Sequence, residues 1–181
     1  MLTITIPATT LWDERTERFI KTKGQTLQLE HSLVSLSKWE SKWCKAFLGK
    51  SVKTDEEILD YIKCMTITQN VDPDVYNSLT DENIKQINKY IDAPMTATRF
   101  PKSENSKSSS EVATAELIYY WMIALNIPFE CQKWHLNRLL TLIRVCNIKN
   151  QPKKKRGSSR TAATDYAAMN AARKKKMGTR G

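Results

Sequence analysis

The stretch Ser35-Leu-Ser-Lys-Trp-Glu-Ser-Lys-Trp-Cys-Lys-Ala-Phe-Leu48 marks the point where the sequence changes from strand-like to helix-like patterning. Its large apolar residues recur every three or four positions: Leu36, Trp39, Trp43 and Phe47. That spacing places them on one face of a helix. Ser35 is a suitable N-cap, and Gly49 lies where such a helix would end. We therefore expect a helix that buries one aromatic face.

Upstream of this stretch, apolar and polar residues alternate with the period of a β-strand. Leu2-Thr-Ile-Thr-Ile6 and Thr26-Leu-Gln-Leu-Glu-His31 both alternate, and a polar turn within 11–20 leads into another strand. Gly24 is expected to supply a further turn. Because these connections are too short for parallel crossovers, the sequence predicts a small antiparallel sheet in a β-hairpin region over residues 1–31.

Downstream of it, the helical period continues to about residue 150, so residues 35–150 are predicted to be helical. Thr54-Asp-Glu-Glu57 fits a capping box, and another helix is expected to begin near Thr80 and to stop before Pro94. Asp72-Pro-Asp-Val-Tyr predicts a shorter turn of helix. Residues 99–110 contain almost no apolar side chains and predict a loop.

Two more helices are expected, over residues 111–126 and from about Pro128 onward. The first has a predicted apolar side: Ala115, Ile118, Tyr119, Met122 and Ile123. The second has a broad apolar face: Leu136, Leu139, Leu140, Ile143 and Val145. Because the connection is short, the two helices are predicted to pack as an antiparallel pair. The fold class is thus α+β, with a single domain over residues 1–150.

Most of the net charge of +10 lies in the last 31 residues. This segment holds ten of the 29 basic residues and one of the 19 acidic ones, which leaves residues 1–150 close to neutral. Its candidate binding residues are all basic: Lys153, Lys154, Lys155, Arg156, Arg160, Arg173, Lys174, Lys175 and Lys176. Residues 161–176 are Ala-rich and favour a helix that is marginal alone, so we expect the tail, 151–181, to become helical on docking.

Composition limits the class of protein and its compartment. No run of 18 apolar residues occurs, so no membrane partner is expected. The N-terminus lacks the pattern of a signal peptide, which predicts that the protein stays in the cytoplasm of the cell that makes it. The four cysteines form no Cys-x-x-Cys pair and are expected to be reduced.

The sequence offers no persuasive catalytic pattern. It has no glycine-rich phosphate loop and no Gly-x-Ser-x-Gly elbow, so we expect neither an enzyme nor a cofactor. Cys131 and His135 are four residues apart and together would make half of a zinc site. The plainer interpretation is that both line an interface between helices, and we expect no metal. The acidic residues at 55–57 and 81–82 are explained by their places at helix starts.

Two groups of residues remain as candidate binding sites. Tryptophan is enriched at binding hot spots, although tryptophans are also common in cores. The expected partner-binding residues are Trp39, Trp43, Trp121, Trp134 and Arg138. The basic tail is either a solvated extension or a segment that binds an acidic protein surface or, without sequence preference, nucleic acid.

Three stretches of the chain resemble small late-operon proteins of long-tailed bacteriophages. They are Leu29-Glu-His-Ser-Leu-Val-Ser-Leu-Ser-Lys-Trp-Glu-Ser-Lys-Trp43, Tyr119-Tyr-Trp-Met-Ile-Ala-Leu-Asn-Ile-Pro-Phe-Glu-Cys-Gln-Lys-Trp-His-Leu-Asn-Arg-Leu-Leu140 and Asn170-Ala-Ala-Arg-Lys-Lys-Lys176. The functional class that they resemble is the tail assembly chaperone. The segment from Trp134 to Leu140 is similar to a tryptophan-containing helix start near the C-terminal part of such chaperones.

The resemblance implies a non-enzymatic role in virion morphogenesis. The implied partners are the tape measure protein, a long helical rod that must stay soluble, and the tail tube subunits that polymerise around it. The alternative is a structural component of the virion, in the head, neck or tail, whose basic arm contacts DNA or neighbouring subunits. The expected location is the host cytoplasm for a chaperone and the virion for a structural component. A nucleic-acid binder acting in the cell ranks third, and the oligomeric state stays open.

Overall fold

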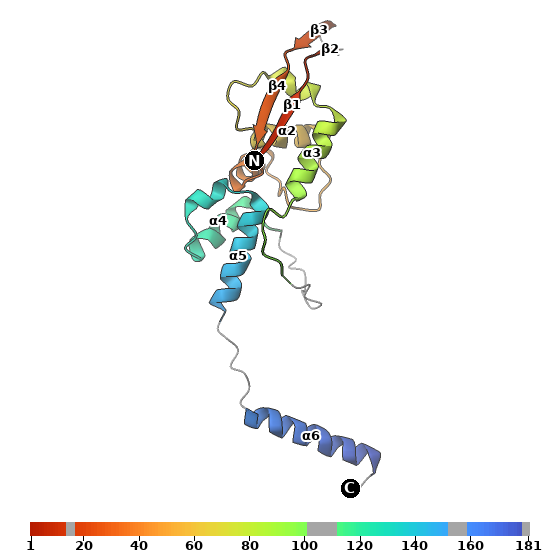
Figure 1. The fold of residues 1–181 in the computed structure, drawn as a ribbon, viewed down its shortest axis with the longest axis vertical. Coiled ribbons are helices and arrows are strands. Elements are labelled where there is room, and N and C mark those ends of the chain that lie inside the picture. Colours follow the sequence, from red (N-terminus) through yellow and green to blue (C-terminus); the bar gives the residue numbers. More distant parts are fainter. Residues whose placement is uncertain (14–16, 101–111, 152–158, 179–181) are drawn as a thin grey trace. The chain divides into compact units, whose positions relative to one another are not determined.

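The computed structural model describes residues 1–13, 17–100, 112–151 and 159–178, and it has the α+β fold that the sequence predicts. Strands come first and helices follow (Figure 1). The elements are β1 (Leu2–Ile6), β2 (Thr9–Asp13), β3 (Arg18–Thr22), β4 (Gln25–Leu29), α1 (Leu33–Trp43), α2 (Asp55–Met65), η1 (Pro73–Ser78), α3 (Asp81–Asp92), α4 (Ala115–Ala124), η2 (Phe129–Lys133), α5 (Leu136–Asn150) and α6 (Ser159–Met177). The chain divides into two compact units, which we call the body (Met1–Ile148) and the tail (Lys149–Gly181).

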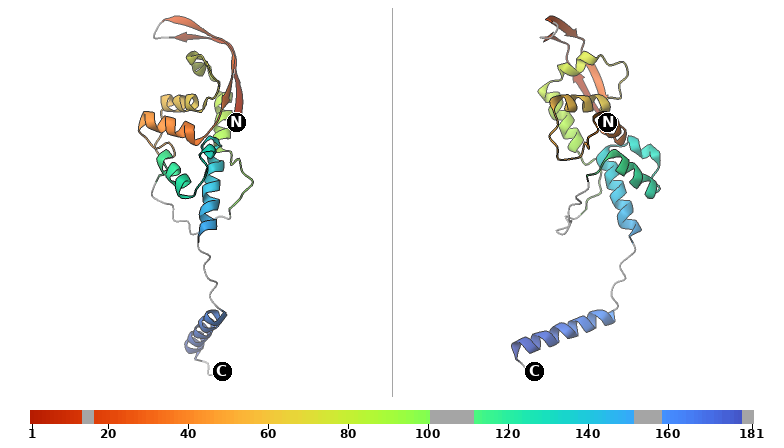
Figure 2. Two further views of the ribbon diagram at one scale, coloured as in Figure 1. Left: turned by 90° about the vertical axis from the view of Figure 1, so that its left-hand side faces the viewer. Right: turned by 180° about the vertical axis from the view of Figure 1, so that it is seen from behind.

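The strands form two consecutive two-stranded antiparallel sheets, not the single sheet expected, and the two follow each other along one curved ribbon (Figure 2). β1 pairs antiparallel with β4, with Leu2 opposite Leu29, and β2 pairs antiparallel with β3, with Thr9 opposite Thr22. β3 and β4 are therefore consecutive parts of one arm, and the expectation of a chain-reversing turn at Gly24 is wrong. Gly24 instead lies across from the Pro7–Ala8 step of the other arm.

Gly24 is required there because the two arms approach closely. A Cβ atom at this position would lie 2.9 Å from the Ala8 backbone nitrogen and 3.1 Å from the Ile6 carbonyl oxygen. Backbone atoms cannot rotate out of the way as the end of a flexible side chain can. The absence of a side chain at residue 24 thus lets the ribbon continue past the break that Pro7 makes in the ladder.

The first hydrophobic core lies between the β1–β4 half of the ribbon and the helices α1, α2 and α3. Alternate residues of the two strands point into it: Ile4, Ile6, Leu27 and Leu29, each at most 1% exposed. Trp39 from α1, Tyr61 and Met65 from α2 and Ile87 from α3 complete it. This alternation confirms the strand pattern expected from the sequence.

The second hydrophobic core gathers the start of α1, the helices α4 and α5, and η2. Its fully buried side chains are Leu33, Leu36, Ala115, Ile118, Met122, Leu136 and Leu139. α4 packs against α1, and residues 125–135, which include η2, separate it from α5. The expected helix start at Pro128 is therefore wrong, because Pro128 precedes a short 3-10 turn and α5 begins only at Leu136, although side chains of both α4 and α5 pack in this core.

A buried carboxylate joins the two cores. Glu40 is 6% exposed and comes from the last turn of α1. Its two oxygens each accept a backbone N–H at 2.7 Å, one from Phe47 and one from Ala115, the first residue of α4. Hydrogen bonds to an ionised acceptor are among the stronger ones, and here they satisfy a buried donor at Ala115 and a part-buried one at Phe47.

The limits of α1 differ from those that the sequence predicts. Ser32, not Ser35, is the N-cap, and Ser35 makes the reciprocal half of a capping box with it. The helix stops at Trp43 because Cys44 adopts a left-handed conformation with φ of 51°. Phe47 therefore lies beyond the helix, although it still packs on both cores.

The starts of α2 and α3 agree with the sequence, whereas α4 begins at Ala115, with Thr114 as N-cap, instead of at residue 111. Thr54 caps α2 in a capping box with Glu57, and Thr80 caps α3 in the same way with Asn83. The acidic residues 55–57 and 81–82 occupy the first turns of these helices, where negative charge is favourable. The short turn expected near Pro73 is the 3-10 helix η1.

The tail contains the helix α6, as the Ala-rich sequence predicts, and Gly178 follows it with φ of 64°. Every described side chain of α6 is exposed. The polar segment expected as a loop lies mostly within 101–111, outside the described residues. In the described part of the chain, no helix has the length and apolar character that crossing a membrane requires.

The Gly24→Ala variant should destabilise the body, because the added methyl group meets backbone atoms of the opposite arm. We expect a cost of about 1–3 kcal/mol, the range of an overpacked site, measured as a lower midpoint of urea unfolding. Gly178→Ala is the matched control: its positive φ of 64° strains the end of α6, but the residue belongs to the tail, so the unfolding midpoint of the body should not change. An unchanged midpoint in Gly24→Ala would show that the ribbon tolerates a wider separation.

Candidate functional site

Trp39, one of the expected partner-binding residues, lies in the first core. Its side chain is 1% exposed, and its indole nitrogen donates to the Glu57 carbonyl oxygen at 2.8 Å. Phe47 and Tyr61 meet the ring edge-on, with centroids at 5.0 and 6.4 Å. Both the apolar surface and the polar atom of this indole are thus satisfied within the body, so a partner cannot reach it without opening the core.

Trp43 is half-buried beside the first core, one helical turn after Trp39. Its indole nitrogen donates to the Asp60 carboxylate at 2.9 Å, and the Lys42 ammonium binds the same carboxylate. This arrangement ties α1 to α2. Trp43 therefore has a structural role that accounts for its position, and only part of its ring is open to a partner.

The block of residues 119–140 contains the remaining expected contacts. Trp121 and Trp134 are both half-buried at the edge of the second core. The guanidinium of Arg138 is exposed and stacks over the Trp134 ring, 4.1 Å from its centroid. A flat cation over an indole face forms a preformed aromatic and cationic surface of the kind found at protein interfaces.

The same block presents three large apolar side chains to solvent, which the sequence reasoning missed. They are Tyr120, Ile123 and Phe129, with exposed fractions of 63%, 61% and 53%, and we call them the α4–η2 surface. Tyr120 and Ile123 are one turn apart on α4, and the Tyr119 hydroxyl donates to Gln132 at 2.9 Å, which holds η2 beside α4. Ile123 was expected on the buried side. The helical period itself separates it from Ile118 and Met122, which face the core.

A polar junction of two histidines lies where the two cores meet. His31 and His135 are 2% and 5% exposed, and their ring centroids are 5.1 Å apart. His31 Nδ1 is 2.6 Å from the Tyr61 hydroxyl, while His135 Nε2–H donates to the Tyr90 carbonyl oxygen at 3.0 Å. The Leu136 N–H donates to the His31 carbonyl oxygen at 2.7 Å, so backbone and side chains bind here together.

Burial makes both rings weak bases. It lowers the pKa of His31 to about 4, and the nearby His135 adds to this effect. Burial also lowers the pKa of His135, although the Tyr90 carbonyl and Glu30 oppose the change. Glu30 binds the Tyr90 hydroxyl at 2.6 Å and the N-terminal ammonium at 2.9 Å. At neutral pH the junction therefore holds two uncharged imidazoles.

The half zinc site suggested by Cys131 and His135 is explained by this junction. Both side chains are buried, and the ring nitrogens of His135 already bind the Tyr90 carbonyl and the Asn137 N–H. Within the described ranges, no group of three His, Cys, Asp or Glu side chains is placed to hold a metal ion. Structural packing thus accounts for the Cys131 and His135 pair.

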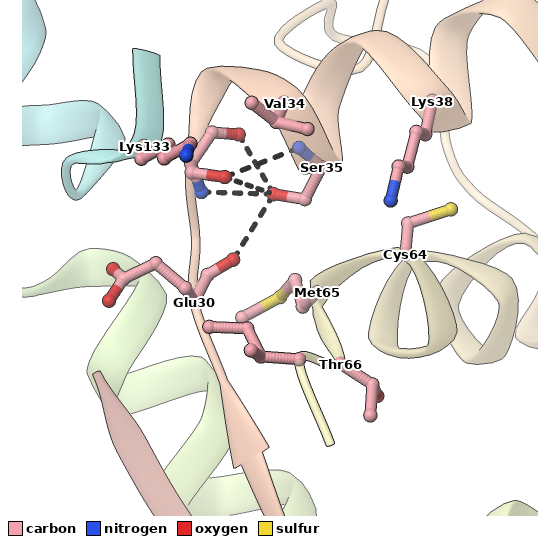
Figure 3. A pocket seen from close by; sticks show the side chains of 10 residues that line it. Glu30, Val34, Ser35, Lys38, Cys64, Met65, Thr66 and Lys133 are labelled. Carbon is pink, nitrogen blue, oxygen red and sulfur yellow. Dashed lines mark hydrogen bonds between the residues drawn. The ribbon is translucent and has the colours of Figure 1, made fainter. Parts of the chain in front are cut away.

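A cavity of about 410 Å³ opens between α1, the end of α2 and η2 (Figure 3). The Lys38 side chain extends toward Cys64 across it. Burial and the charge of Asp60 raise the pKa of the Cys64 thiol, and the charges of Lys38 and Lys42 offset only part of that rise. Cys64 therefore stays a protonated thiol near neutral pH, which does not favour nucleophilic chemistry there.

The basic tail residues are partly outside the described chain. Lys153, Lys154, Lys155 and Arg156 lie within 152–158, and the side chain of Arg160 is not described. Arg173, Lys174, Lys175 and Lys176 are exposed in the last turns of α6. Cations there complement the helix dipole, and Arg173, Lys175 and Lys176 suit contact with a polyanion or an acidic surface.

Comparison with protein-family models, with curated proteins and with solved structures finds no match to this chain. The candidate sites therefore stand on their own geometry, which offers an aromatic and apolar surface in the block 119–140 and a cationic helix in the tail.

Acid should destabilise the body through the histidine junction. Between pH 6.5 and about 4 the unfolded chain binds protons that the folded body excludes, so the free energy of unfolding falls as the pH is lowered. His31 alone should lower the free energy of unfolding by about 3 kcal/mol at pH 4 compared with its value above pH 6.5. Urea unfolding at several pH values measures it. His31→Gln, which can still bind Tyr61 but does not titrate, should flatten the profile, and an equally steep profile would contradict the assignment.

Truncation should separate the core tryptophan from the surface one. Trp39→Ala should cost about 3–5 kcal/mol of unfolding free energy, because it removes the largest side chain of the first core. Trp134→Ala should cost less, about 1–2 kcal/mol, because the half-buried ring loses its contact with Arg138 and only part of a full core packing. Thermal melts followed by circular dichroism give both values, and equal losses would contradict the different roles.

Proposed function

We propose that this protein is a non-enzymatic factor of bacteriophage morphogenesis that acts as a tail assembly chaperone and binds the tape measure protein. The observation that carries the proposal is the exposed α4–η2 surface, Tyr120, Ile123 and Phe129, together with Arg138 over Trp134. These residues belong to the block 119–140, which also carries the resemblance to tail assembly chaperones. Tail tube subunits are the second partner that the resemblance implies.

The chemistry of this surface suits a helical, apolar partner. Large apolar side chains that stay exposed on a folded body mark a place where another protein binds. A tape measure protein is a long helix that must be kept soluble, and the apolar stripe of such a helix would cover Tyr120 and Ile123. The exposed guanidinium of Arg138 offers an ion pair to an acidic residue at the edge of that stripe.

The tail supports a second candidate, a structural component of the virion. The exposed cations of α6, Arg173 and Lys174–Lys176, suit contact with packaged DNA or with acidic neighbouring subunits. The two candidates differ in whether the protein remains in the particle. A chaperone acts in the host cytoplasm and leaves, whereas a structural component is retained at a fixed copy number.

Mass spectrometry of purified particles distinguishes the two candidates. We expect the protein to be abundant in the lysate of infected cells and missing from mature particles. A constant number of copies per particle would instead favour the structural role.

Capture of the tape measure protein tests the surface itself. The tagged double variant Tyr120→Ser, Ile123→Ser should recover at least tenfold less tape measure protein from infected cells than the unaltered chain, because the apolar contact is lost. Val52→Ser is the matched control, since Val52 is 95% exposed and far from this surface in the sequence. Equal recovery by both variants would exclude the α4–η2 surface as the binding site.

A further inference from the structure

We propose that the groove between α2 and α3 binds the tail helix α6 of a second copy of the chain. This contact would link copies head to tail. It uses a surface different from the α4–η2 surface, and it does not depend on the identity of the chaperone's client.

The groove is a pair of adjoining hollows with an apolar floor. One has a volume of about 550 Å³ and the other about 250 Å³, and both are lined by Ile58, Ile62 and Ile84. The larger hollow adds Leu59 and Leu79, whereas the smaller adds Ile87 and Ile91. Isoleucine and leucine side chains from α2, from α3 and from Leu79 just before α3 thus line both hollows.

The groove is open where a partner would bind. Ile58 is 41% exposed although it stands where the two hollows meet. Ile62 and Ile87 below it are at most 2% exposed, so the floor is firmly part of the first core. A groove with an exposed isoleucine and a buried apolar floor can be covered by a partner helix, whose apolar side chains one turn apart would pack against it.

The two ends of the groove differ in charge. Asp55 and Glu56, both exposed, line the larger hollow at the start of α2. The exposed acidic residues of the first turn of α3, Asp81 and Glu82, precede Ile84 of the same hollow. Lys53 lines the smaller hollow. A fitting partner therefore carries apolar residues along one face and positive charge at the end that meets Asp55 and Glu56.

The helix α6 has these properties. Its three large apolar side chains are Tyr166, Met169 and Met177, with exposed fractions of 69%, 68% and 72%. At 3.6 residues per turn they fall within an arc of about 80°, so they form one stripe. The stripe extends for about 16 Å, close to the length of about 18 Å expected for the 12-residue α3. The basic residues Arg173–Lys176 crowd the C-terminal end.

Charge sets the direction of binding. With the C-terminal turns of α6 beside Asp55 and Glu56, the cations Arg173 and Lys176, which lie within or next to the apolar stripe, meet the acidic end of the groove. Tyr166 and Met169 then lie over the smaller hollow, on Ile58 and Ile87. Each copy has one groove and one α6, so the contact is heterologous and can extend from copy to copy.

Analytical ultracentrifugation of the full-length chain up to about 100 μM tests the proposal. We expect association that rises with concentration and weakens several-fold in 0.5 M salt, because ion pairs at the groove's acidic end are screened. Ile58→Lys should weaken association at least tenfold by placing a cation in the groove. Val52→Lys, at a fully exposed position before α2, is the matched control and should associate normally.

A second variant keeps the test independent of folding of the body. Met169→Asp changes only the exposed stripe of α6 and should also weaken association at least tenfold. A mixture of Ile58→Lys and Met169→Asp chains should form a heterodimer, because one intact groove and one intact α6 remain. A full-length chain that stays monomeric overturns the proposal, and so does association that survives either variant. Neither result bears on capture of the tape measure protein.

Discussion

The carboxylate of Glu40 is the constraint on which the arrangement of the body depends. It is buried at the end of α1 and accepts the N–H groups of Phe47 and Ala115, each at 2.7 Å. The first bond folds the chain back after the left-handed residue Cys44, and the second holds the start of α4 against α1. Loss of this side chain would leave the buried Ala115 N–H unsatisfied, which costs more than the hydrogen bond contributes, and would also free the part-buried Phe47 N–H. One side chain thus sets both the path after α1 and the place of the second core.

The histidine junction lies at the start of α1, at the opposite end of the helix from Glu40. Ser32 and His135 form an isolated bridge, and the imidazoles of His31 and His135 fill the space between the cores without charge. Polar groups buried with all partners present specify one arrangement, because any shift would leave one of them unpaired. Tyr61 and Tyr90 supply those partners from α2 and α3, so each helix of the first core contributes to the alignment of the second.

Local sequence signals predicted where most strands and helices lie, whereas strand pairing and side-chain exposure depend on tertiary contacts. Alternation identified β1 and β4, and Thr54 and Thr80 marked helix starts, because each depends only on neighbouring residues. The pairing of β2 with β3 was not predictable in this way, since it depends on Gly24 facing Ala8 across the ribbon. In the candidate site, Trp134 and Arg138 were identified, but Tyr120 and Ile123 were not, because exposure follows from which face of α4 meets α1. Burial of Trp39 likewise follows from the position of Tyr61 and Phe47.

The division of α1 between two cores has a consequence for the dynamics of the molecule. Leu33 and Leu36 belong to one core and Trp39 to the other, so displacement of this helix would open both cores at once. The backbone amides of α1 should then exchange with deuterium only through unfolding of the whole body, and they should be its slowest. The β2–β3 pair should open locally at a lower free energy, because among the described strands these two pair only with each other.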